Sequence, residues 1–230
     1  MAGADGHRET EWLLQESARS AHVRRLVIWA PVERPDLPGF LDAALAAGGG
    51  RIAGVRRAIE GQPPDFCRSP SVLAGVRSLA GRGLSFDLVL TPDQMGAATA
   101  LVAACPEVRF ILDHAGKPAV GGAFSQAWSA ALREMARLPN VACKISGLIT
   151  EADLERWTRE DIEPYVRHAI ECFGWDRVLF GSDWPVCLLA GGVERWLEAV
   201  MWCLRDATAE QIECLLCRNT ARSYCLSLFT

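Results

Sequence analysis

The sequence predicts an α/β fold built from repeated strand–helix units. Short, nearly all-apolar segments alternate with longer segments in which apolar residues recur at helical spacing. The apolar segments follow one another at intervals of about 30 residues, the usual size of one strand–helix unit. No linker, low-complexity stretch or change in composition marks a boundary, so residues 1–230 are predicted to form a single domain.

Six segments are predicted to be buried parallel strands, because they are apolar nearly throughout. They are Leu26–Ala30, Ile52–Arg56, Ser85–Leu90, Arg109–Asp113, Val141–Ile145 and Val178–Phe180. Helices are predicted at Glu9–Ser20, Leu37–Ala47, Ser71–Gly81, Asp93–Ala104, Ser125–Leu138, Arg159–Phe173, Val193–Arg205, Ala209–Leu216 and Ala221–Leu228. Pro92 stands at the start of one of these helices, and Pro106 and Pro139 follow the ends of two others. Six such strands are compatible with an open doubly wound sheet or with a closed (β/α) barrel.

The overall composition excludes two classes of partner. The net charge is −4, so no basic surface is expected for nucleic acid or for an anionic membrane. No apolar run approaches the roughly 20 residues that span a bilayer. The first residues, MAGADGHRETEW, lack the apolar core of a signal peptide. We therefore expect a soluble, cytoplasmic protein.

The nine cysteines stand among apolar neighbours rather than in a disulfide or zinc pattern. Cys214 and Cys217 form one C-x-x-C inside a helical pattern, without the second pair that a zinc site needs. We expect the cysteines to be small buried hydrophobic residues in a reducing compartment.

Polar side chains lie in the last residues of several predicted strands or directly after them. They are Arg56 and Arg57, Asp113 and His114, Lys144 and Ser146, and Ser182, Asp183 and Trp184. Because burying an unpaired charge is costly, these residues are better explained as a shared polar site than as packing. In α/β folds such sites form at the carboxyl ends of the strands.

Two of these side chains are candidates for chemistry. His114 ends a buried strand, whereas His22 and His168 lie in charge-rich helical segments and are expected to face solvent. Asp183 follows the apolar segment RVLFGSD, where a carboxylate serves either as a helix N-cap or as a general base for water. The position alone leaves those two roles of Asp183 open.

Three segments resemble the amidohydrolase-related family, which includes L-fuconolactonase, rhamnonolactonase and 2-pyrone-4,6-dicarboxylate lactonase. They are Phe110–Pro118 (FILDHAGKP), Asn140–Ala152 (NVACKISGLITEA) and Phe173–Leu188 (FGWDRVLFGSDWPVCL). The resemblance implies an eight-stranded (β/α) barrel of the TIM type, from the metal-dependent hydrolase superfamily. The six strands of this chain would correspond to strands three to eight of that barrel.

The resemblance also implies an activity, the hydrolysis of a sugar-acid lactone by activated water. His114 matches the histidine that polarises the scissile carbonyl or binds a metal, and Asp183 matches the aspartate that takes a proton from the attacking water. Arg56 and Lys144 match positions that hold substrate carboxylate or hydroxyl groups. Trp184 would form an apolar wall beside the ring. For these last three residues, packing and salt bridges are an equal alternative. One divalent ion, zinc or manganese, held by His114 and Asp183 is one option, and metal-free hydrolysis is the other.

The chain departs from this family at its N-terminus. Related enzymes begin with a strand carrying Asp-x-His-x-His and a second strand of the V-x-V-Q type, and neither is present here. Asp5-Gly6-His7 is followed by Arg8 and Glu9, so His7 is not expected to replace the missing histidines. We expect a barrel truncated to strands three to eight, with half of the histidine site and two open sheet edges that favour homo-oligomers.

Alternative functions follow from this departure. One is a non-catalytic barrel that binds a small acid or needs a partner segment. The other is a decarboxylase of the same superfamily that acts on a ring carboxylate. The lactonase is the leading hypothesis, because GSDWP, LDHxGKP and CKxSGL occur together in the matching order.

Overall fold

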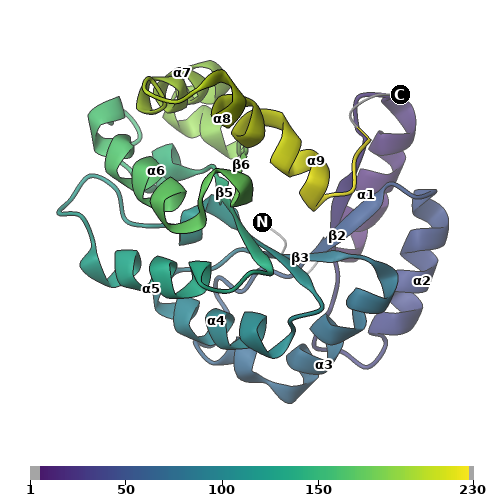
Figure 1. Ribbon diagram of the computed structural model, residues 1–230. Coiled ribbons are helices and arrows are strands. Elements are labelled where there is room, and N and C mark those ends of the chain that lie inside the picture. The colour runs from purple at the N-terminus through teal and green to yellow at the C-terminus, as the bar shows by residue number, and fades with distance from the viewer. Residues whose placement is uncertain (1–5, 228–230) are drawn as a thin grey trace.

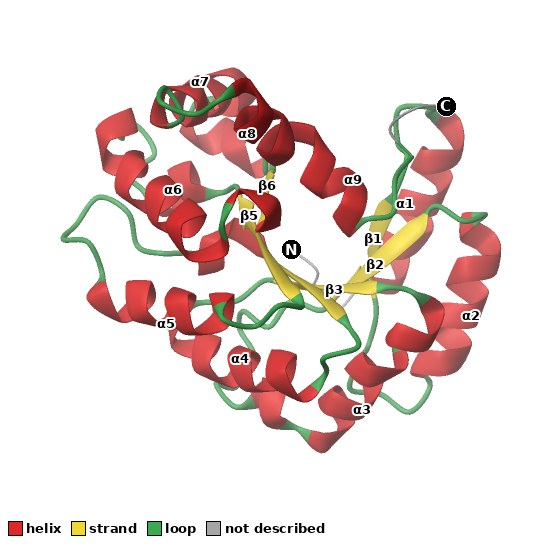
Figure 2. Cartoon of the chain, in the orientation of Figure 1, coloured by secondary structure: helices red, strands yellow, loops and turns green. Residues whose placement is uncertain are grey.

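The computed structural model describes residues 6–227 as a parallel sheet covered by helices (Figures 1 and 2). The strands are β1 (Leu26–Trp29), β2 (Ile52–Arg56), β3 (Ser85–Leu88), β4 (Arg109–Leu112), β5 (Val141–Ile145) and β6 (Val178–Phe180). The helices are α1 (Gly6–Arg19), α2 (Leu37–Gly48), α3 (Pro70–Ser78), α4 (Met95–Ala104), α5 (Gln126–Ala136), α6 (Arg159–Phe173), α7 (Gly192–Cys203), α8 (Ala209–Glu213) and α9 (Asn219–Ser223).

The predicted elements are confirmed, and β2, β5, β6 and α6 have the predicted bounds. Most other bounds shift by only one to three residues. The C-terminal helices differ more, because a π-helical turn over Cys214–Arg218 separates α8 from α9. The predicted last helix is wrong beyond Ser223, since residues 224–227 form a turn and irregular chain. The predicted end of the last helix, Leu228, lies outside the described residues.

The strand order is that of a barrel wall. Each strand pairs in parallel with the next one along the chain, in the order β1-β2-β3-β4-β5-β6. A doubly wound sheet would reverse this order at a switch point. The sheet instead curves, with the helices that follow β1 to β5 around its outer side (Figure 1). The α/β class is thereby confirmed, and the alternative of a doubly wound sheet is excluded. Among residues 6–227, β1 and β6 do not pair with each other.

The main core lies between the strands and the surrounding helices. Its largest fully buried side chains include Trp128 of α5, Trp196 of α7, and Phe86 and Phe110, whose rings meet edge to face. Each such aromatic residue buries roughly 150–250 Å². This core holds the strands in place and so positions the loops at their carboxyl ends.

Two expectations about single residues are wrong. His168 is buried rather than solvent-facing, because α6 turns it toward α5, where it packs against Trp128 and its Nε2 lies 2.9 Å from Ser129 Oγ. Cys217 and Cys225 are exposed, whereas Cys67, Cys105, Cys143, Cys187 and Cys203 are buried as expected. His22 is exposed, as predicted.

His7 belongs to α1 and packs against the rings of Trp29 and Phe40, with ring centroids 5.1 and 4.9 Å away. It therefore makes an aromatic contact, while Asp5 lies outside the described residues. Within the described part of the chain, every helix is too short or too polar to cross a membrane.

Candidate active site

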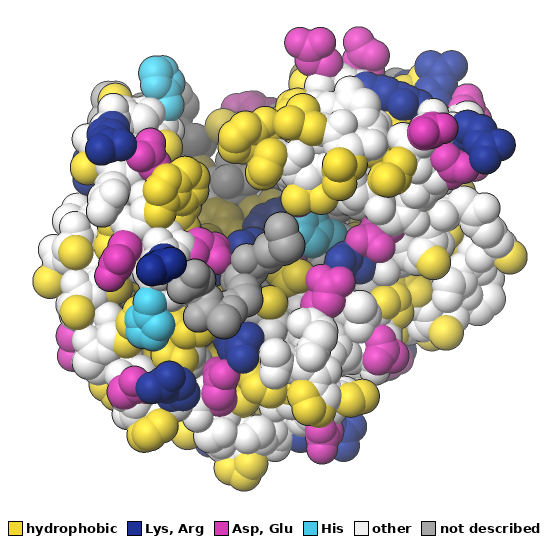
Figure 3. All heavy atoms as spheres, turned by 180° about the vertical axis from the view of Figure 1, so that it is seen from behind, with side chains coloured by type: hydrophobic (Ala, Val, Ile, Leu, Met, Phe, Trp, Pro, Cys, Tyr) yellow, Lys and Arg dark blue, Asp and Glu magenta, His cyan; other side chains and the backbone are white. Residues whose placement is uncertain are grey.

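A cavity of about 740 Å³ is formed by the segments that follow β2, β3, β4, β5 and β6. Four of the five predicted site residues line it, namely His114, Asp183, Arg56 and Trp184, whereas Lys144 does not. The cavity is also lined by Glu60, Lys117 and Glu151, three charged residues that were not predicted from the sequence. Figure 3 shows the molecule from behind, with a central hollow where basic, acidic and histidine side chains lie near one another.

His114 and Asp183 face each other in this cavity. The distance from His114 Nε2 to Asp183 Oδ1 is 3.8 Å, and both side chains are largely buried. This distance is too long for a direct hydrogen bond and leaves the facing atoms available to a third group. Burial raises the pKa of Asp183; His114 opposes this shift and Asp113 adds to it. The pair thus combines a ring nitrogen with a carboxylate that binds a proton more readily than an exposed one.

The other ring nitrogen of His114 is held by β5 and its following turn. His114 Nδ1 lies 2.9 Å from the hydroxyl oxygen of Ser146, a side chain that is 1% exposed. Gly147 comes next, with φ +65°, and a Cβ built on it would lie 2.6 Å from His114 Nδ1 and 3.1 Å from Asp183 Oδ2. A side chain at residue 147 would therefore displace one member of the pair. If the Ser146 hydroxyl donates to Nδ1, the ring proton lies on Nε2 and points toward Asp183.

The turn that carries His114 has an unusual backbone. His114, Ala115, Gly116 and Lys117 all have positive φ, between 48° and 72°. For a residue other than glycine this conformation costs about 1–2 kcal/mol. The turn is kept by a hydrogen bond from Lys117 N to His114 O and by Trp128 Nε1, which donates to Ala115 O. Strain of this kind concentrates at functional sites, and here it turns both His114 and Lys117 into one cavity.

Lys144, predicted to hold substrate, instead forms ion pairs with two buried aspartates. Its Nζ lies 2.5 Å from Asp113 Oδ1 and 3.2 Å from Asp87 Oδ2. Tyr224 donates to the same Asp87 oxygen at 2.5 Å. Burial lowers the pKa of Lys144, but Asp113 and Asp87 outweigh it and raise the pKa well above its ordinary value. Burial also opposes ionisation of Asp113, yet Lys144 lowers the net pKa of that carboxyl. We conclude that Lys144 supports the site from outside the cavity.

Two of the overlooked residues had a signal in the sequence. Asp87 stands inside the apolar strand SFDL and is 1% exposed, so the same cost of burying a charge would have identified it. Lys117 belongs to the Gly-Lys-Pro turn after His114. Glu60 and Glu151 carry no such signal, because an isolated glutamate in a loop is usually solvated.

The described residues do not make up a complete metal site. His114 and Asp183 supply two donors, but no group of three or more His, Cys, Asp or Glu side chains within residues 6–227 is placed to hold an ion. Zinc in proteins usually has at least three protein ligands.

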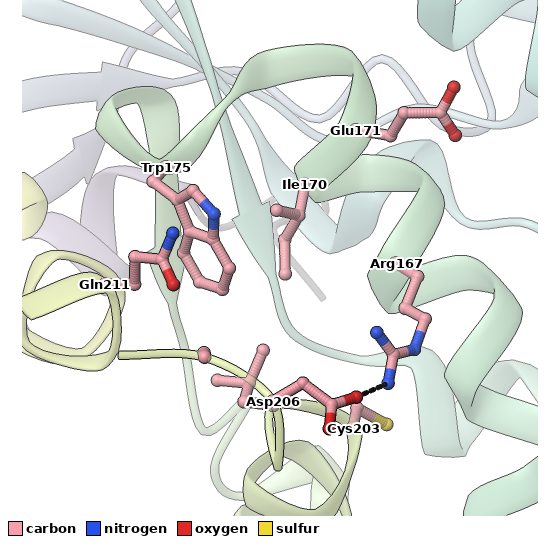
Figure 4. A pocket seen from close by; sticks show the side chains of 9 residues that line it. Arg167, Ile170, Glu171, Trp175, Cys203, Asp206 and Gln211 are labelled. Atoms are coloured by element: carbon pink, nitrogen blue, oxygen red, sulfur yellow. Dashed lines mark hydrogen bonds and ion pairs between the residues drawn. The ribbon is translucent and has the colours of Figure 1, made fainter. Parts of the chain in front are cut away.

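A second cavity, of about 340 Å³, lies on the helical outside of the molecule between α6 and the segment joining α7 to α8 (Figure 4). Its principal polar contact is the ion pair of Arg167 with Asp206 at 3.2 Å. It contains neither His114 nor Asp183. We therefore assign the candidate site to the larger cavity at the strand ends.

Comparisons with known proteins agree with this assignment. The chain matches the model of a family described as Amidohydrolase over residues 1–226. It is 34% identical over 200 residues to an L-fucono-1,5-lactonase of Burkholderia ambifaria, covering 85% of this chain and 67% of the relative. It is also 34% identical over 212 residues to an L-fucono-1,5-lactonase of Burkholderia multivorans, covering 84% of this chain and 71% of the relative. A crystal structure of an amidohydrolase from Burkholderia multivorans with bound zinc has a TM-score of 0.90 and 31% identity, covering 96% of this chain and 80% of that chain.

Proposed function

Because this chain belongs to the amidohydrolase family, we propose that it hydrolyses the ring ester of a sugar-acid lactone of the aldonolactone type. The observation that carries the proposal is the His114–Asp183 pair, whose Nε2 and Oδ1 face each other across 3.8 Å in the cavity at the strand ends. This reaction places the protein in carbohydrate metabolism.

Asp183 acts in this proposal as the general base. It takes a proton from water, and the water oxygen bonds to the lactone carbonyl carbon. His114, with its proton on Nε2, donates a hydrogen bond to the carbonyl oxygen as negative charge develops there. The bond from the carbonyl carbon to the ring oxygen then breaks, and the ring oxygen receives the proton from Asp183 and leaves as a hydroxyl group. The product is the open-chain sugar acid.

Arg56 and Trp184 are proposed to contact the substrate. Arg56 lines the cavity and lies 3.5 Å from Glu9, so its guanidinium is partly neutralised and suited to hydrogen bonding with hydroxyl groups. Trp184 also lines the cavity, with 65% of its surface exposed, and offers an apolar face to the sugar ring.

The direct test is hydrolysis of fucono-, rhamnono- and galactonolactone by the purified protein. Acid release is measured with and without added zinc or manganese. We expect turnover above the spontaneous rate on at least one lactone without added metal. Stimulation by zinc or manganese would show that the hydrolysis uses a divalent ion. A folded protein that turns over none of them would contradict the proposal and leave a binding role.

As the pH is lowered, kcat/KM is expected to fall at a higher pH than it would if the base were a carboxylate with an ordinary pKa. Asp183 works as a base only when it is ionised, and burial raises its pKa above the ordinary value of about 3.9. The acid limb of kcat/KM should therefore lie above that value. A kcat/KM profile between about pH 3.5 and 8 on the best lactone measures this, and an acid limb at or below about 4 would exclude a raised pKa for the base.

Gly147→Ala is expected to lower kcat/KM by at least about tenfold, because small displacements of catalytic groups cost one to two orders of magnitude. The new Cβ would meet His114 Nδ1 at 2.6 Å. Gly83→Ala is the matched control, since Gly83 has nearly the same φ, +68°, but nothing within 4 Å of its Cβ position. Equal losses of activity in both variants would attribute the effect to backbone strain alone.

We also propose that the protein acts in the cytoplasm. All nine cysteines are free thiols, which fits a reducing compartment.

We propose in addition that the protein self-associates, because β1 and β6 each lack a second strand neighbour among the described residues. Light scattering after size-exclusion chromatography measures the oligomeric state directly.

A further inference from the structure

Lys117 is held between two carboxylates at the rim of the cavity that contains His114 and Asp183. Its Nζ lies 2.8 Å from Glu60 Oε1 and 3.2 Å from Glu151 Oε1. The Lys117 side chain is 18% exposed, and all three residues line the cavity. A lysine flanked by two glutamates presents both donors and acceptors to a ligand, which is the pattern that neighbouring hydroxyl groups require.

The three side chains are held by the loops that carry them. Lys117 is fixed by the left-handed turn after β4. The Glu60 main chain donates to Val89 O, and the preceding residue is bound by the buried side chain of Gln94. Glu151 closes the turn after β5, where its carbonyl accepts from Val120 N. A binding group built on such anchored segments is preorganised, so little ordering is needed when a ligand arrives.

The charge of the cavity selects against an anionic ligand. Its described cations are Arg56 and Lys117, and each lies within 4 Å of a carboxylate, since Arg56 contacts Glu9. Three carboxylates, Glu60, Glu151 and Asp183, line the same space. Burial lowers the pKa of Lys117, but the two glutamates raise it overall, so the lysine stays charged and remains a donor. A substrate carboxylate would therefore meet more negative than positive charge.

We propose that Lys117, Glu60 and Glu151 form the hydroxyl-binding group of this site, and that it selects uncharged, hydroxylated lactones over lactones that carry a ring carboxylate. This inference rests on the proposed function for the identity of the ring, but it concerns recognition rather than the reaction. Lys117 is a specificity-determining residue, and its removal should affect only ligands that have hydroxyl groups to bind.

Binding and turnover test the proposal separately. The probes are an aldono-1,5-lactam, which keeps the ring hydroxyls and resists hydrolysis, and δ-valerolactam, which lacks the hydroxyls. Calorimetric titration of the wild-type protein should show tighter binding of the hydroxylated lactam. Lys117→Met should weaken that binding by roughly tenfold to hundredfold, the effect of losing hydrogen bonds to a charged group. Its binding of δ-valerolactam should not change.

Arg57→Met is the matched control. Arg57 makes a comparably buried ion pair with Glu33 at 2.9 Å, between neighbouring loops at the same end of the sheet, but does not line the cavity. This variant should keep the preference for the hydroxylated lactam. If Lys117→Met weakens the binding of both lactams equally, or of neither, the lysine only holds the loops together and the proposal is wrong.

The double variant Glu60→Gln, Glu151→Gln frees Lys117 from its carboxylates. It should improve kcat/KM on a carboxylated lactone, such as 2-pyrone-4,6-dicarboxylate, relative to an uncharged aldonolactone by about tenfold or more. An unchanged ratio would overturn the charge argument. If the wild-type protein hydrolyses no lactone but binds the lactam in a Lys117-dependent way, the proposed function fails while this inference stands.

Discussion

Asp183→Asn is expected to abolish lactone hydrolysis, lowering kcat by about 10²- to 10⁴-fold, the usual contribution of a positioned general base. The amide has the shape of the carboxylate but cannot accept a proton from water at neutral pH. It would still face His114 Nε2, so the geometry of the pair is retained. Initial rates of acid release on the best aldonolactone measure the effect.

The fold should tolerate this substitution. Burial raises the pKa of Asp183, so its ionised form costs the folded state free energy above the unfolded pKa, and the neutral amide removes that cost. The melting temperature should therefore be equal to or slightly above that of the wild-type protein. Asp176→Asn, at the exposed opposite end of β6, is the control and should keep full activity. Full turnover by Asp183→Asn would remove this residue as the base.

Lys144→Met is expected to lower the free energy of unfolding by about 3–5 kcal/mol, the cost of breaking a buried ion pair by removing one partner. Asp87 and Asp113 are 1% and 3% exposed, and Lys144 is the cation that both contact. Methionine fills a similar volume, so the loss reports on charge rather than on a cavity. Urea unfolding at pH 7 measures it.

Protonation should reduce this deficit. Without Lys144, burial would raise the folded-state pKa of both aspartates above their unfolded value, so stability is regained as the pH falls and lost as it rises. The difference in the free energy of unfolding between Lys144→Met and the wild-type protein should therefore become smaller as the pH falls from 7 to about 4.5. Arg82→Met, which breaks the exposed pair with Asp42, should cost no more than about 1 kcal/mol and is the control. A similarly small effect of Lys144→Met would show that water reaches the aspartates.

Much of the fold could be predicted from the sequence, because strands buried beneath surrounding helices are rich in apolar residues. Strand β6 is apolar throughout, β2 and β5 each carry one charged residue in an otherwise apolar segment, and helix α6 begins at a Thr158 capping box, so their bounds follow from neighbouring residues. The motifs around His114 and Asp183 selected both residues, and the structure brings the two together across 3.8 Å.

The tertiary structure decided what depends on contacts between distant segments. Whether a lysine near the end of a strand meets substrate or an aspartate is set by residues 57 and 31 positions away, as Lys144 with Asp87 and Asp113 shows. His168 was misplaced for the same reason, since its burial depends on packing against α5. Lys117 acquires its two glutamates only when the turns after β2, β4 and β5 meet. The sequence by itself determined the order of the elements and the two residues proposed for catalysis. Only the folded chain determined which charges neutralise one another, because electrostatic interactions depend on distance in space and not on separation along the chain.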